Sequence, residues 1–149
     1  MPGRIKVFLD TSVIIAAVLS PSGGARQVFL MGEAGFLDLM IGPIVLREAD
    51  EVTRRKAASS LSLLAQLLEA GRVKTSLKAT NKQIEDARER IHYQPDACVL
   101  AEAIAAQPDW FITHDKEHFL KAGKELEISF NIGTPGDLIL AIKDQYRSF

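Results

Sequence analysis

Short apolar runs alternate with longer segments of helical periodicity along the whole 149-residue chain. Five of these runs are predicted to be strands: Ile5–Leu9, Leu37–Ile41, Val73–Leu77, Trp110–Thr113 and Ile128–Ile132. Strands that alternate with helices predict a layered α/β fold, because parallel strands must be joined by crossover connections that cover the sheet. We expect a single domain over residues 1–149, since no repeat, low-complexity segment or linker divides the chain.

The helix candidates are bounded by residues that commonly start or stop helices. Gly35 and Gly71 are C-terminal stops, and Pro43 is suited to the first turn of a helix. Thr80 and Gln83 have the spacing of a capping box. The predicted helices cover residues 13–19, 25–34, 43–56, 59–70, 80–91, 95–106, 116–122 and 135–146.

The composition limits the classes of function. With 47% hydrophobic and 25% charged residues, the chain is typical of a soluble globular protein. No apolar run approaches the roughly 20 residues that cross a bilayer, and we expect no membrane association. A single Cys98 and the absence of a signal-like leader favour the cytoplasm. The net charge of −1 excludes binding to nucleic acid by bulk charge, so positive charge must come from local residues, metal ions or a partner.

Two acidic residues follow predicted strands. Asp10 ends the first strand, and Asp115 lies just beyond the fourth. In open α/β sheets, ligands bind at the carboxyl ends of the strands, near the point where the strand order reverses. We therefore expect the first and fourth strands to be neighbours, with both carboxylates at one edge. A side-chain oxygen of the Asp10-Thr11-Ser12 segment is also expected to cap the first helix.

Two further acids come from predicted helices. Glu48 lies three residues after Val45 and four before Val52, so the 3.6-residue period places it on the core-facing side. Asp96 lies three residues before Val99 and is expected to share its face at the start of a helix.

The negative charge of an acidic side chain that faces inward must be balanced by a partner, because an unpaired buried charge costs free energy. No Lys or Arg shares these faces within the motifs, and a divalent cation would offset the repulsion. Oxygen ligands suit Mg²⁺ or Mn²⁺, which can activate water and stabilise both oxygens in phosphodiester cleavage. Each acid also has an ordinary structural interpretation: Asp10 and Asp115 as caps, Asp96 in a favourable helix dipole, and Glu48 at a helix surface.

The segments around these acids resemble the PIN domain family, which includes toxin components of prokaryotic toxin–antitoxin pairs. The segments are Val7–Val13, Val45–Ala49, Asp96–Ala101 and Phe111–Asp115. The resemblance implies a Rossmann-like, three-layer α/β/α sandwich with a mostly parallel five-stranded sheet. It implies a hydrolase that cleaves RNA phosphodiester bonds as a metal-dependent endoribonuclease, with Mg²⁺ or Mn²⁺ as cofactor. An antitoxin protein is the implied partner beside the RNA substrate.

The resemblance also assigns roles to individual residues. The catalytic and metal-binding positions of the family fall on Asp10, Glu48, Asp96 and Asp115. Thr11 or Ser12, and Thr113, fall where the family often has a hydroxyl that supports the site. His114 departs from the pattern, since a small residue usually precedes the last acid; its ring is expected to narrow substrate access or to contact RNA.

Other charged residues carry less information. Arg47, Arg54 and Arg55 cluster on one predicted helix, where they can meet phosphates or form a solvated face. His114 and His118 are four residues apart, but two histidines without a third ligand are weak evidence for a metal site.

Three alternatives to the nuclease interpretation can be weighed against the residues, and two of them lack a residue that they require. One is a catalytically weak protein that uses the same fold to bind or regulate a partner. A phosphorelay receiver would need an acceptor Asp after the third strand, which ends in Leu77-Lys78 instead. A haloacid-dehalogenase-like phosphatase would need a second Asp where Ser12 stands. The leucine-rich segment 61–68 is either a stripe that packs in the core or a surface through which the protein forms a homodimer.

Overall fold

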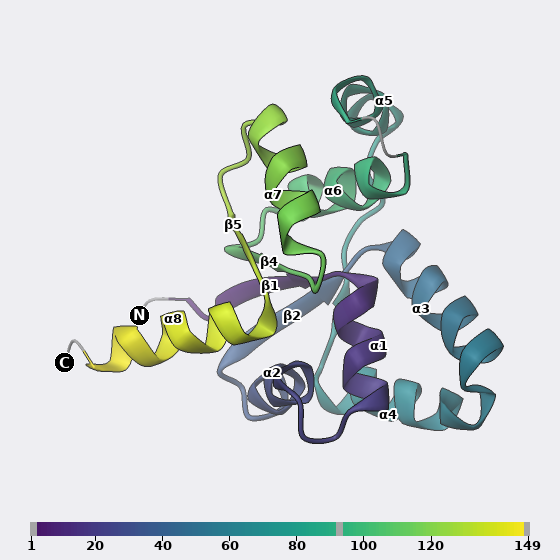
Figure 1. Cartoon of the computed structure of the whole chain (residues 1–149), viewed down its shortest axis with the longest axis vertical. Helices are drawn as coiled ribbons and strands as arrows, with labels where there is room; N and C mark the ends of the chain where they lie inside the picture. Colours follow the sequence, from purple (N-terminus) through teal and green to yellow (C-terminus); the bar gives the residue numbers. More distant parts are fainter. Residues whose placement is uncertain (1–2, 92–93, 148–149) are drawn as a thin grey trace.

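The computed structural model describes residues 3–91 and 94–147, which contain one five-stranded parallel sheet (Figure 1). Its strand order is β3-β2-β1-β4-β5, with every pairing parallel. The strands are β1 (Ile5–Leu9), β2 (Leu37–Ile41), β3 (Lys74–Thr75), β4 (Trp110–Ile112) and β5 (Asn131–Gly133). The sheet is the predicted one, but it is parallel throughout rather than mostly parallel.

Helices lie on both sides of this sheet, which gives the predicted three layers. Figure 1 shows α6 and α7 above the sheet and α1, α2 and α4 below it, as right-handed crossovers require. The last helix, α8, packs against α2. The helices are α1 (Thr11–Leu19), α2 (Gly24–Glu33), α3 (Pro43–Lys56), the 3₁₀ turn η1 (Ala58–Ser60), α4 (Leu61–Ala70), α5 (Asn81–Arg90), α6 (Gln94–Ala106), α7 (Lys116–Glu125) and α8 (Pro135–Arg147).

The predicted element boundaries are wrong mainly at the sheet edges. The third and fifth strands are shorter than predicted because each pairs with only one neighbour, so extended backbone beyond the pairing is not held. Ile128 and Phe130, assigned to the fifth strand, instead pack against the core before the strand begins. The predicted side-chain cap of α1 is also wrong: Asp10 is the N-cap residue but makes no capping bond. The capping box of Thr80 and Gln83 is confirmed.

The two central strands form the core of the sheet. Phe8 of β1 is the register partner of Phe111 of β4, and their rings stack with centroids 5.7 Å apart. On α7, Phe119 packs against Phe111 at a centroid distance of 4.8 Å. All three side chains are buried, so the junction of β1 and β4 is fixed by apolar packing as well as by backbone hydrogen bonds.

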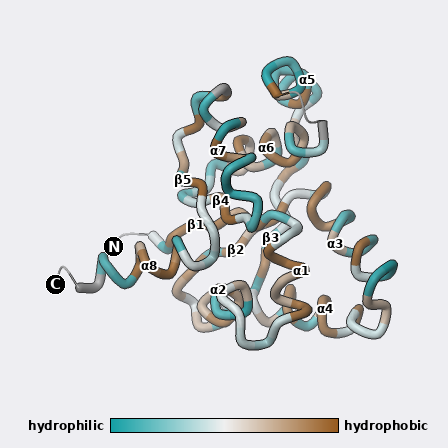
Figure 2. Tube along the Cα trace, in the orientation of Figure 1, coloured by the Kyte–Doolittle hydropathy of each residue, from teal (hydrophilic) through white to brown (hydrophobic). Residues whose placement is uncertain are grey.

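Figure 2 shows hydrophobic residues gathered in the strands and α1, whereas α5 is mostly hydrophilic. Among the described residues, no single helix is long and apolar enough to cross a membrane. In the described part of the chain, α1 and α2 pass such a test only when they are taken together, as two helices bent by 96°.

The strand order places a switch point between β1 and β4. From β1 the chain moves outward through β2 to β3, and then returns to the other side of β1 to form β4 and β5. The predicted adjacency of the first and fourth strands is confirmed, and the amide of Asp10 donates to the carbonyl of Ile112 at 3.0 Å. The carboxyl ends of these two strands therefore lie side by side.

One buried carboxylate joins two helices of different layers. Glu102 of α6 is 1% exposed, and both of its oxygens accept from the amide of Ile44 at 3.1 Å, in the first turn of α3. Burial raises the pKa of Glu102, while the amides of Ile44 and Val45 favour its charged form. Gly42, the N-cap of α3, leaves the space that this side chain fills, since a Cβ there would collide with the carboxylate.

We predict that Glu102→Ala lowers the free energy of unfolding by about 1–3 kcal/mol, because the partly buried amide of Ile44 then loses its partner. Glu102→Gln should lower the free energy of unfolding by less, since its side-chain carbonyl can still accept that hydrogen bond. Urea denaturation followed by circular dichroism measures both. Wild-type stability in the Ala variant would contradict the assigned role.

Candidate functional site

Two hydroxyls hold the carboxylate of Asp10 at the β1–β4 junction. Ser12 Oγ donates to Asp10 Oδ2 at 2.7 Å, and Thr113 Oγ1 donates to the same oxygen at 2.8 Å. Asp10 is 8% exposed and Thr113 is fully buried. No described residue donates to Oδ1 of Asp10, so this carboxylate is oriented through one oxygen and keeps the other for a ligand.

The same hydroxyls shape the turn that carries the last acid. The amide of His114 donates to Ser12 Oγ at 3.0 Å, and the amide of Asp115 donates to Thr113 Oγ1 at 2.9 Å. Each hydroxyl thus accepts from the turn and donates to Asp10. This network ties the position of Asp115 to that of Asp10 across the two strands.

Asp96 is the most perturbed acid of the group. It lies in the first turn of α6, and its side chain is 13% exposed. Burial raises the pKa of Asp96 to about 6, even though nearby His118 favours the charged form. The carboxylates of Asp115, Asp10 and Glu48 each raise this pKa further. The four predicted acids therefore act on one another, although they come from four separate parts of the chain.

Glu48 is exposed, whereas the sequence predicts that it lies on the core-facing side of its helix. Val45 and Ala49 of α3 are fully buried, as the periodicity predicts, but Glu48 itself is exposed. A long side chain at the edge of an apolar stripe can reach into solvent while its backbone stays near the core. Glu48 borders the site from its exposed side, and its charge still affects Asp96.

The tightest group of potential ligands includes a histidine. Donor atoms of Asp96, Asp115 and His118 all lie within 4.8 Å of one another. His118 Nε2 is 2.7 Å from Asp96 Oδ2, a contact that the sequence did not indicate. Asp10 and Glu48 are outside this compact group, so only part of the predicted ligand set is drawn together.

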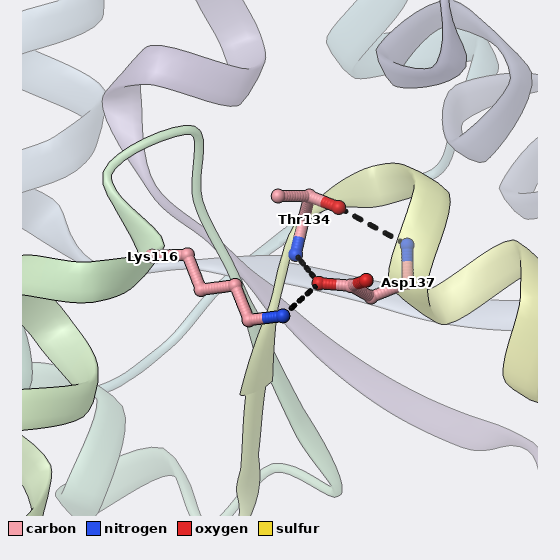
Figure 3. Close-up of polar contacts among 3 residues, drawn as sticks. All are labelled: Lys116, Thr134 and Asp137. Atoms are coloured by element: carbon pink, nitrogen blue, oxygen red, sulfur yellow. Dashed lines mark hydrogen bonds and ion pairs between the residues drawn. The ribbon is translucent and has the colours of Figure 1, made fainter.

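A second set of contacts fixes the turn after Asp115. Figure 3 shows Lys116 Nζ beside Asp137 Oδ2, at a distance of 2.8 Å. The amide of Thr134 donates to the same carboxylate, and Thr134 Oγ1 accepts from the amide of Asp137, which closes a capping box at the start of α8. The hydrogen bond from Lys116 holds the pKa of Asp137 below its usual value. The start of α7 is thereby tied to the start of α8.

The remaining predicted residues fall into two groups. Of the two hydroxyl candidates after β1, Ser12 contacts Asp10, whereas Thr11 Oγ1 is buried and has no hydrogen-bond partner in the described part of the chain. Arg47 and Arg55 are exposed on α3. Arg54 pairs with Asp50 at 2.8 Å on the same helix.

Sequence reasoning assigned no role to Glu102 or to the pair of Lys116 and Asp137, and it weighed His118 only together with His114, as weak evidence for a metal site. Glu102 had a readable signal: it is the only charged residue between Ala97 and Ala106, and a lone acid in such an apolar helix indicates a buried, partnered carboxylate. His118 is three residues after Asp115, a spacing that places both on one face of a helix start. The partner of Lys116 could not be inferred, because Asp137 lies beyond another strand.

A separate cavity of about 760 Å³ lies at the opposite, amino ends of the strands. Its lining is largely apolar and includes Ile5, Met31, Phe36 and Ile142. The four predicted acids do not line this cavity, so it is not the candidate site.

Comparison with known proteins places this arrangement in a family. A family model described as "PIN domain" matches residues 6–117, the stretch from β1 to the start of α7. The chain belongs to the PIN domain family. The match includes the hydroxyl network and all four acids but ends before His118 and Asp137. No curated protein matches the sequence.

Solved structures share the fold at low sequence identity. VapBC2 from Rickettsia felis, bound to a DNA fragment from its promoter, has 14% identity and a TM-score of 0.68, with 87% of this chain and 98% of that chain covered. DNA-bound VapBC from Salmonella typhimurium has 15% identity and a TM-score of 0.63, with 89% and 99% covered. VapC20 from Mycobacterium tuberculosis, a toxin that cleaves the sarcin–ricin loop, has 18% identity and a TM-score of 0.55, with 77% and 94% covered.

We predict that, without metal, Asp96→Asn melts at a higher temperature than the wild type at pH 8, and that the difference shrinks towards pH 5. The folded-state pKa of Asp96 is raised from 3.8 to about 6. The stability that Asp96 contributes is therefore fully present below about pH 4 and lost as the pH rises through about 6. Asparagine cannot ionise, so it avoids this loss.

Thermal unfolding in the presence of a chelator, from pH 5 to pH 8, measures the difference. Glu51→Gln is a matched control, since Glu51 is an exposed acid on α3 and does not affect the pKa of Asp96. A difference that stays constant with pH would show that the carboxylate is not strained by its surroundings.

Proposed function

We propose that this protein is a divalent-metal-dependent endoribonuclease and the toxin of a toxin–antitoxin pair. Membership of the PIN domain family supports a nuclease at the family level. The observation that carries the proposal for this chain is the compact group of Asp96, Asp115 and His118, whose donor atoms lie within 4.8 Å of one another. The charges of Asp115, Asp10 and Glu48 all disfavour the charged form of Asp96 beside this group. Such mutual repulsion is relieved when a cation binds.

The residues fit a divalent cation. Asp96 Oδ2 is shielded from solvent and has no hydrogen-bond partner in the described segments, although His118 Nε2 lies close to it. Asp10 keeps Oδ1 for a ligand because both of its hydroxyl donors use Oδ2. Carboxylate oxygens are the ligands that Mg²⁺ and Mn²⁺ prefer. We assign Asp10, Asp96 and Asp115 to hold one or two such ions, with Glu48 binding metal or orienting water.

A bound divalent cation lowers the pKa of water and offsets the charge that develops on the phosphate during hydrolysis. The chain supplies the rest. Ser12 and Thr113 fix the orientation of Asp10, and their bonds to the turn amides fix Asp115. The exposed Glu48 can accept a proton from water at the open side of the site.

The assignment as a toxin rests on the structural relatives. Two of them are VapBC structures bound to DNA, and a third is a toxin that cleaves the sarcin–ricin loop. Each matches this chain over more than three quarters of its length. We infer an antitoxin as protein partner, RNA as substrate and the cytoplasm as location. The exposed Arg47, Arg55 and His114 are candidates for contacts with RNA phosphates.

We predict that the purified protein cleaves RNA from a mixed pool when Mg²⁺ or Mn²⁺ is added, and that cleavage stops when a chelator removes the ion. Asp10→Asn and Asp96→Asn should reduce cleavage by at least about 100-fold, because each removes a charge that holds the metal. Gel analysis of the RNA fragments measures the rates, and circular dichroism checks that the variants fold.

The control is a matched pair on α3. Glu48→Gln should slow cleavage, whereas Glu51→Gln, about one turn away and exposed, should not. Full activity in both aspartate variants would refute the nuclease site. Metal binding without RNA cleavage would favour a catalytically weak protein that uses the fold to bind a partner.

A further inference from the structure

We propose that His118 is a ligand of the metal site, and that its nitrogen makes this protein prefer a transition-metal ion such as Mn²⁺ over Mg²⁺. The inference rests on the proposed function and specifies the ion that the same site takes. It concerns a residue outside the part of the chain that the family match covers.

The start of α7 presents His118 beside an acid of the site. Asp115 is the N-cap residue of α7, and His118 lies three residues later, in the first turn. Side chains at this spacing share one face of a helix. That face meets the start of α6, where Asp96 lies, and α6 and α7 are in contact.

The distances suit three ligands of one ion. His118 Nε2 is 2.7 Å from Asp96 Oδ2, and no two donor atoms of the group with Asp115 are more than 4.8 Å apart. Around an octahedral ion with bonds of about 2.1 Å, neighbouring ligand atoms are about 3 Å apart and opposite ones about 4.2 Å. Small side-chain adjustments therefore suffice for these atoms to surround an ion.

The contact between His118 and Asp96 lacks the alignment of a hydrogen bond. Asp96 Oδ2 has almost no exposed surface, and within residues 3–91 and 94–147 it has no hydrogen-bond partner. A buried carboxylate oxygen without such a partner is costly, so this position calls for a stronger interaction. A shared metal ion supplies it for the oxygen and the ring nitrogen together.

The helix turn that carries His118 is held from two sides. The next residue, Phe119, is buried and packs on Phe111 of β4. Lys116, on the other side, forms the ion pair with Asp137 of α8 (Figure 3). The backbone at position 118 is thereby fixed before any ion binds, which lowers the entropy cost of using the side chain as a ligand.

The donor type determines which ion is preferred. Mg²⁺ favours oxygen ligands, whereas imidazole nitrogen binds first-row transition metals well. A competing interpretation is that a protonated His118 simply neutralises Asp96 when no metal is present. The two interpretations predict opposite effects of removing the histidine, because a ligand strengthens metal binding whereas a competing cation weakens it.

The test uses the full chain loaded with Mn²⁺. Pulsed electron paramagnetic resonance detects nitrogen nuclei bonded to Mn²⁺, and we expect a nitrogen signal in the wild type that disappears in His118→Gln. The matched control His114→Gln, at the exposed histidine four residues earlier, should keep the signal. Calorimetry should show Mn²⁺ binding weakened at least about tenfold in His118→Gln and Mg²⁺ binding changed much less.

Each outcome decides the proposal. Mn²⁺ bound by the wild type without a nitrogen signal, or bound more tightly by His118→Gln, would overturn the role of His118 and leave the proposed nuclease intact. A nitrogen signal that disappears only in His114→Gln would overturn it as well. A wild-type chain that binds neither Mn²⁺ nor Mg²⁺ would overturn this proposal together with the metal dependence of the proposed function.

Discussion

The hydrogen bonds between Asp10 and the hydroxyls of Ser12 and Thr113 are the interactions on which the rest of the site depends. They join the two strands that meet at the reversal of strand order, and they place a charged group where the apolar sheet ends. Stacking of Phe8 on Phe111 holds the same junction from within the core. Backbone hydrogen bonds therefore set the distance between the two strands, apolar packing holds their junction, and the hydroxyls fix the orientation of the carboxylate above it.

Repulsion among the acidic side chains near Asp96 is the second feature that shapes the site. A chain with a net charge of −1 concentrates acids at one sheet edge, so the excess of negative charge is local rather than general. Asp96 bears most of this repulsion because its largely shielded carboxylate is affected by the charges of the other three acids. Such an arrangement lowers stability in the free chain and is retained where it serves binding or catalysis.

Much of this architecture could be predicted from the sequence, and the reasons are local. The sequence predicts β1 and β2 at their observed bounds, because each is a short, mainly apolar run with a single charged residue. Asp10 and Asp115 could be placed together because strand ends and crossover rules leave few alternatives. The exposure of Glu48, the partner of Glu102 and the approach of His118 to Asp96 depend on how helices from different parts of the chain pack, and periodicity within one helix carries no such information.

The close contact between Gly42 and Glu102 limits which substitutions this chain can accept. The carboxylate of Glu102 occupies the space beside position 42, and it links the helix that carries Asp96 to the helix that carries Glu48. A larger residue at position 42 alone would collide with this carboxylate and strain the contact between the two helices. The two sites are therefore expected to covary across descendants, with a larger residue at 42 accepted only after a shorter one arises at 102.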